Sequence, residues 1–137
     1  MKSISESLEN APAGQDDYTA FLHDLLDGVQ ELEDPEAFFA AAFRFFEEHS
    51  GADLGAPGPL VHLLERFYPD YLDFLCASAK RKPTTYSVWM INRILNAELP
   101  VDRRTRLLAL LRQAADNPAA DVAARRQATA FLRQLED

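Results

Sequence analysis

Proline and glycine interrupt this chain at short intervals, and this spacing limits what it can fold into. The 137 residues include eight prolines and five glycines. Both residue types tend to end regular structure, proline because it lacks a backbone N–H and glycine because its backbone is so free. The segments between the breaks run to about 10–17 residues, the length of ordinary globular helices. No useful stretch alternates polar and apolar residues, so we expect no sheet.

The segment after Asp34 shows the helical pattern clearly. Asp34 is a suitable N-cap, and Pro35 suits the first helical position, where its missing N–H has no cost. Six residues then recur at helical spacing and form a wide, mostly aromatic face: Phe38, Phe39, Ala42, Phe43, Phe45 and Phe46. Ser50 and Gly51 end the pattern. We expect an amphipathic helix here.

The same reading along the chain predicts an all-α protein of about seven helices. Asp16 and Asp102 are further candidate N-caps. We expect residues 1–15 to be a partly ordered segment and residues 16–137 to form a single helical domain. From about residue 58 onward the pairing of helices resembles HEAT-like repeats, which are antiparallel helix pairs stacked in sequence order. A globular helical bundle is the alternative architecture.

The charged residues are distributed unevenly. The net charge is −8, but residues 1–70 carry 15 Asp and Glu against 3 Lys and Arg, whereas residues 71–137 carry 7 against 11. An acidic half repels nucleic acid and attracts basic proteins. Exposed carboxylates also serve simply to keep helical proteins in solution, and that alternative stays open.

The acidic residues of the first half have a geometry. Those between residues 16 and 32 follow helical spacings of seven, three and four, so they form one stripe beside the apolar one. Others extend the charge around the next turn. Such a stripe steers a basic partner and sets its register. The candidate partner-binding carboxylates are Asp17, Asp24, Asp27, Glu31, Glu33 and Asp34.

Cysteine content and hydropathy indicate a cytoplasmic protein. Cys76 is the only cysteine, so no disulfide forms within the chain, which fits a reducing compartment. The N-terminal residues contain no apolar segment of the kind found in signal peptides. No run of about 18 apolar residues is present, so we expect no membrane-spanning helix.

A search for catalytic or metal-binding patterns finds little. His62 and Glu65 share a helix face, but a metal site of that kind needs more carboxylates and a second similar helix. Cys76 lies among apolar residues, which favours a buried side chain over a nucleophile. A hydrolase built on these three residues is a minor alternative. We therefore expect no enzyme activity, no metal and no cofactor.

The last two helices carry a group of basic residues. They are Arg103, Arg104, Arg106, Arg125, Arg126 and Arg133. Nucleic-acid binding calls for such a patch together with aromatic residues and a basic net charge. The aromatic residues are elsewhere and the protein is acidic, so we interpret these arginines as exposed polar faces and expect no nucleic-acid partner. Pairing of some of them with the acidic half of the same molecule is an alternative that stays open.

The segment YSVWMINRILN has two different faces when read as a helix. Met90, Ile94, Ile91, Leu95 and Val88 fall in one arc. The opposite arc holds Tyr86, Trp89, Asn92, Arg93 and Asn96. These five are candidate partner-binding residues, because Trp, Tyr and Arg are enriched at binding hot spots. In the alternative interpretation the aromatic residues pack against neighbouring helices and the asparagines bond to loop backbone.

Residues 59–96 carry a family resemblance. The features are a helix PLVHLLERF, a following helix with the pattern Tyr-x-x-x-Leu, and a proline before a helix reading Trp-Met-Ile-Asn-Arg-Ile-Leu-Asn. Together they resemble bacterial immunity proteins of the all-helical, HEAT-like kind, which accompany polymorphic toxins and contact-dependent inhibition systems. The first 57 residues share only acidity and helicity with that family.

The resemblance implies a cytoplasmic, non-catalytic protein that occludes a cognate toxin C-terminal domain, often a nuclease with a basic cleft. It implies no shared catalytic residues, and it does not identify the toxin. A helical-repeat adaptor or scaffold that binds another cytosolic protein is the alternative function.

Overall fold

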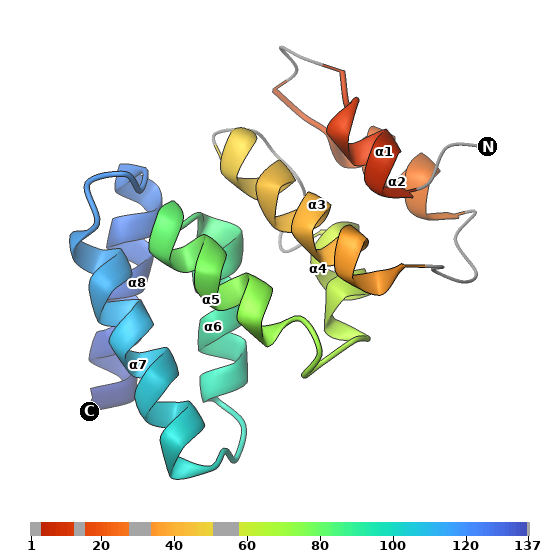
Figure 1. Ribbon diagram of the computed structural model, residues 1–137. Helices are drawn as coiled ribbons and strands as arrows, with labels where there is room; N and C mark the ends of the chain where they lie inside the picture. The colour runs from red at the N-terminus through yellow and green to blue at the C-terminus, as the bar shows by residue number, and fades with distance from the viewer. Residues whose placement is uncertain (1–3, 13–15, 28–33, 51–57, 137) are drawn as a thin grey trace. The chain divides into compact units, whose positions relative to one another are not determined.

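The computed structural model describes residues 4–12, 16–27, 34–50 and 58–136 (Figure 1). Within those ranges the chain forms eight α-helices and no strand, which confirms the all-α class. The helices are α1 (Ile4–Glu9), α2 (Thr19–Asp27), α3 (Pro35–Glu48), α4 (Pro59–Glu65), α5 (Leu72–Arg81), α6 (Thr85–Leu95), α7 (Val101–Asp116) and α8 (Val122–Glu136). Seven correspond to the expected helices. The eighth, α1, lies in the segment expected to be only partly ordered.

The chain divides into two compact units, Met1–Phe74 and Leu75–Asp137. The boundary falls inside α5. No helix in the described part of the chain is both long enough and apolar enough to cross a membrane.

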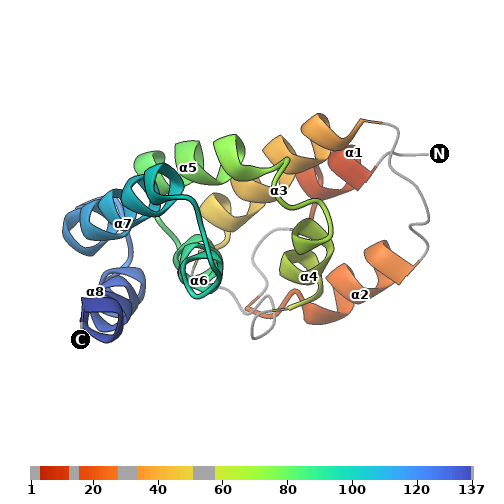
Figure 2. The same cartoon turned by 90° about the horizontal axis from the view of Figure 1, so that it is seen from below.

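The first unit is built around the aromatic face of α3. This helix packs against α1, while α2 packs against α4 (Figure 2). All six residues of the expected face are buried, which confirms the prediction from spacing. Phe39 is 1% exposed and has four aromatic neighbours, with ring centroids 5.5 to 6.3 Å away. Those neighbours are Phe38, Phe67, Tyr71 and Phe74. Interlocking rings of this kind dominate the burial of apolar area in a small core.

The start of α3 follows the sequence prediction. Asp34 Oδ1 accepts a hydrogen bond of 3.1 Å from the backbone N–H of Ala37, and Pro35 occupies the first turn. The side chain therefore satisfies one of the four N–H groups that a helix start leaves without an intrahelical partner.

Replacing Asp34 tests this cap. We expect Asp34→Ala to lower the free energy of unfolding by about 1 kcal/mol, because one N–H loses its acceptor. Asp34→Asn should cost little, since asparagine caps as well as aspartate does. Urea unfolding of the three proteins measures both effects. Equal losses in the two variants would show that charge, rather than capping, is what Asp34 contributes.

Two other expected N-caps are wrong. Helix α2 begins at Thr19, so Tyr18 and not Asp16 precedes its first residue, and the Thr19 N–H donates to Asp17 Oδ1 over 2.8 Å. Helix α7 begins one residue before Asp102, which lies inside the first turn. Pro100 occupies the N-cap position and makes no side-chain cap bond. A carboxylate in a first turn still interacts favourably with the helix dipole.

In the second unit α6, α7 and α8 run alternately down, up and down (Figure 1). Each of the three packs against the other two. Helix α7 contributes Leu107, Leu110 and Leu111, whereas α8 contributes the small residues Ala124 and Ala128, both fully buried. Small side chains let helix backbones approach closely, which suits this packing. The antiparallel order is the one expected of stacked helix pairs, and the HEAT-like repeat assignment stays a prediction.

Helix α6 starts with a buried capping box. Thr84 Oγ1 accepts from the Ser87 backbone N–H over 3.1 Å, and Ser87 Oγ accepts from the Thr84 backbone N–H over 2.9 Å. Both side chains are 0% exposed. The reciprocal bonds satisfy polar groups that would otherwise be buried without partners. They anchor the helix that carries one of the two candidate site segments.

Candidate functional site

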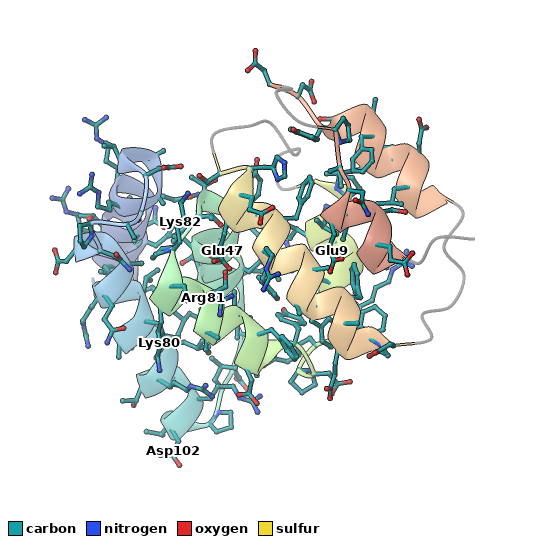
Figure 3. All side chains as sticks on the ribbon, turned by 45° about the horizontal axis from the view of Figure 1, so that its top comes forward. Glu9, Glu47, Lys80, Arg81, Lys82 and Asp102 are labelled. Atoms are coloured by element: carbon teal, nitrogen blue, oxygen red, sulfur yellow. The ribbon has the colours of Figure 1, made fainter. Side chains whose placement is uncertain are left out.

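The acidic and basic residues of the chain separate by unit. Residues 1–74 contain 16 Asp and Glu against 3 Lys and Arg, a balance of −13, and residues 75–137 contain 6 against 11, a balance of +5. Figure 3 labels examples: Glu9 on α1 and Glu47 on α3 in the first unit, and Lys80, Arg81 and Lys82 at the end of α5 in the second. The uneven charge seen between the two halves of the sequence therefore also holds between the two structural units.

The candidate carboxylates of the first unit lie on α2 and at the start of α3. Asp17 and Asp24 are exposed, and so is the cap residue Asp34. Asp27 is the last residue of α2. Glu31 and Glu33 lie outside the described residues. Asp17, Asp24 and Asp34 are therefore open to solvent, where a charged partner reaches them without a desolvation barrier.

Asp17 is held in its charged form. Hydrogen bonds from Thr19, first through its side chain and then through its backbone N–H, lower the pKa of the Asp17 carboxyl from its usual 3.8. A lowered pKa in the folded state stabilises the fold above pH 3.8, and this contribution disappears as the pH falls through the folded value. An NMR titration should place the Asp17 midpoint below 3.8.

The structure divides the second candidate set, on α6, into core and surface members. Tyr86 is 9% exposed and belongs to the core. Asn96 is exposed, and its Nδ2 donates to the backbone carbonyl of Asn92 over 3.0 Å at the helix end. The same carbonyl also accepts from the Asn96 backbone N–H over 3.1 Å, so the side chain adds a second bond at the end of the helix. Tyr86 and Asn96 thus have structural roles that the helical wheel could not separate from binding.

Trp89 and Arg93 form the surface part of the set. The guanidinium carbon of Arg93 lies 5.1 Å from the centroid of the Trp89 ring, which is a cation–π geometry. Arg93 is exposed, and Trp89 and Asn92 are half-buried. A tryptophan held in place by an arginine offers a partner a large apolar surface whose conformation is already restricted.

Substitution of Trp89 tests its part in binding. We expect Trp89→Ala to weaken binding of the partner by about 2 kcal/mol or more, roughly thirtyfold in Kd, because hot-spot tryptophans contribute on this scale. Arg93→Ala should cost less. Lys80→Ala, an exposed cation at the end of α5, is the control. Calorimetry measures the Kd, and circular dichroism confirms that each variant is folded. Unchanged affinity in Trp89→Ala would remove α6 from the interface.

The three residues of the hydrolase alternative are divided between the two units. His62 Nδ1 lies 3.4 Å from Glu65 Oε1 on α4, as the spacing implied. Cys76 belongs to the other unit and is 1% exposed. In the part of the chain that the structure describes, no three His, Cys, Asp or Glu residues gather closely enough to hold a metal ion.

Sequence reasoning did not anticipate an open, shallow hollow that residues of α8 alone line. It lies among arginines that were interpreted only as a polar face: Arg125, Arg126 and Arg133. The sequence holds no clear signal of it, because Asp121 just before α8 and Glu136 at its end give this segment both signs of charge, as on an ordinary solvated helix. The positions of the arginines along the sequence do not show whether other helices pack over that face.

Comparisons with protein-family models, with curated proteins and with solved structures found no match. The function is therefore argued from the charges and surfaces above.

Proposed function

We propose that this chain is an immunity protein, which neutralises a cognate bacterial toxin domain by binding and occluding it. The observation that carries the proposal is the concentration of charge in the first unit, −13 in 74 residues, with Asp17, Asp24 and Asp34 exposed. The resemblance of residues 59–96 to helical immunity proteins supports the same function. In this proposal the protein acts in the cytoplasm and has no catalytic role.

Charge of this density affects how a partner arrives. A patch of one sign raises the local concentration of an oppositely charged protein and accelerates association by about 10–10³-fold at low ionic strength. A nuclease presents a basic cleft because its substrate is a polyanion. The exposed carboxylates of α2 and α3 would occupy such a cleft in place of phosphate groups.

The Trp89–Arg93 pair on α6 offers a second kind of contact. Electrostatic attraction raises the association rate and orients the partner, and salt screens it. A desolvated aromatic side chain instead slows dissociation of the complex. A tight inhibitor needs both properties. An acidic surface and an aromatic anchor in one chain therefore suit stoichiometric neutralisation.

The test is co-purification with the C-terminal domain encoded by the gene immediately upstream, followed by calorimetry and a growth assay. We expect a one-to-one complex of nanomolar or tighter Kd, below about −12 kcal/mol in binding free energy, and loss of the domain's toxicity. An upstream gene without a toxin domain, or a toxin domain that does not bind, would reject the proposal. The alternative would then be a helical adaptor for another cytosolic protein.

A further inference from the structure

Hydrogen bonds from outside α6 close the C-terminal end of this helix. A helix leaves its last four C=O groups without intrahelical donors, and helix ends fray. The carbonyls of Asn92 and Ile94 accept from backbone N–H groups that lie just beyond the helix. The carbonyl of Leu95, the last residue of α6, accepts from Arg104 Nη1 over 3.0 Å. This last bond therefore comes from a side chain of the next helix.

Arg104 reaches this carbonyl from the first turn of α7. Its own backbone N–H donates to the carbonyl of Pro100 over 3.0 Å, so its main chain belongs to α7. Its side chain, expected on an exposed polar face, is half-buried and bonds back across the connection between α6 and α7 (Figure 1). A cationic donor at the C-terminal end of a helix makes a charge-assisted bond and also interacts favourably with the helix dipole.

The same last turn of α6 carries Arg93. The guanidinium carbon of Arg93 lies 5.1 Å from the centroid of the Trp89 ring, and Trp89 lies one turn earlier in the helix. Residues four positions apart share a helix face, so the pair keeps this geometry only while the turn between them stays helical. Fraying of the last turn would move Arg93 away from the ring and remove a contact that restricts Trp89.

We infer that Arg104 is a positioning residue for the Trp89–Arg93 pair. By bonding to Leu95 it keeps the last turn of α6 helical, and so it keeps Arg93 over the Trp89 ring. A side chain that is ordered before binding loses less entropy when a partner immobilises it. The effect of Arg104 on binding rests on the proposed function, whereas its effect on Trp89 is a property of the chain alone.

The first experiment measures the mobility of Trp89 without a partner. Trp89 is the only tryptophan, so a single indole N–H signal reports on it in NMR relaxation. Arg104→Met keeps a long apolar side chain but removes the donor to Leu95. We expect the order parameter of the indole N–H to fall from a rigid value of about 0.85 towards the flexible range below about 0.6. Arg104→Lys should keep most of the order, because an ammonium group also donates to a carbonyl.

Arg126→Met is the matched control. Arg126 is an exposed arginine of α8 in the same unit, so the substitution removes the same charge and the same donors on a different helix. Loss of one hydrogen bond changes the folding equilibrium by about fivefold, so Arg104→Met should remain folded, which circular dichroism checks. Equal order of Trp89 in Arg104→Met and Arg126→Met would overturn the inference.

The second experiment asks whether Arg104 acts on binding through Trp89. The partner is the toxin domain of the proposed function, and calorimetry gives the Kd of Arg104→Met, of Trp89→Ala and of the double variant. We expect Arg104→Met to raise the Kd by about fivefold in the unmodified chain and by less than about twofold in Trp89→Ala. An equal effect in both backgrounds would show that Arg104 acts independently of Trp89, and it would overturn the positioning role.

Different results reject the positioning role and the proposed function. A toxin domain that does not bind the unmodified chain rejects the proposed function, and the relaxation measurement then still decides whether Arg104 orders Trp89. Unchanged order of Trp89 in Arg104→Met rejects the positioning role, even where the toxin domain binds tightly.

Discussion

Replacing Phe39 by alanine should destabilise the first unit by about 3–5 kcal/mol, the range measured for phenylalanine-to-alanine changes in closed cores. Phe39 is 1% exposed and lies among four aromatic rings, so its removal deletes contacts on every side and leaves a cavity. A domain of this size is typically stable by about 5–15 kcal/mol, which makes such a loss a large part of the total. Urea unfolding followed by circular dichroism measures it.

A second phenylalanine-to-alanine substitution is the control for Phe39→Ala. Phe131→Ala alters the same side chain at a half-buried position of α8, and it should cost clearly less because fewer contacts are lost. The single tryptophan, Trp89, lies in the second unit, so its fluorescence reports on that unit. A loss below about 1 kcal/mol for Phe39→Ala would contradict the assignment of Phe39 to the centre of the core.

Reversing two carboxylates of the first unit should slow association with the toxin domain. We expect Asp24→Lys combined with Glu36→Lys to reduce the association rate about tenfold or more at low salt, because steering contributes on that scale. The difference from the unmodified protein should shrink at high salt as the charges are screened. Stopped-flow measurements at several salt concentrations test both statements. Neither residue makes a hydrogen bond to another described side chain, so the fold should survive.

Glu98→Lys combined with Asp116→Lys is the control for net charge. Both residues are exposed and belong to the second unit, and the total change is the same. The control should associate nearly as fast as the unmodified protein, since steering depends on where the charge lies. Equal slowing in both double variants would mean that net charge matters and that the acidic unit is not the contact surface.

Much of the helical structure could be predicted from local chemistry. The cap at Asp34, the proline after it and the aromatic spacing of α3 act within a few residues of each other, so they are legible in the sequence. The buried arc of α6 is predictable for the same reason, because Val88, Ile91 and Leu95 share one face. The predicted first residues of the helices were less reliable. At α2 and α7 more than one residue could serve as a cap, and backbone geometry chooses among them.

At the candidate site on α6, the local sequence pattern does not predict which residues are buried. Tyr86 and Trp89 fall in one arc of the helical wheel, yet Tyr86 lies in the core and Trp89 lies at the surface beside Arg93. A helical wheel shows on which side of the helix a residue lies, but it does not show whether neighbouring helices bury that side. The wheel likewise does not show that Asn96 closes its own helix with a bond to Asn92.

The sequence by itself determined the helical class, the segregation of charge and the faces of the longer helices, because these follow from residue order over one or two turns. Only the tertiary structure decided which polar faces stay uncovered. Arg104 of α7 donates to the backbone carbonyl of Leu95, whereas Arg125, Arg126 and Arg133 of α8 border an open hollow, although both sets look alike as sequence. Whether a charged face is paired depends on neighbours that are distant in the chain, and packing of whole helices brings those neighbours together.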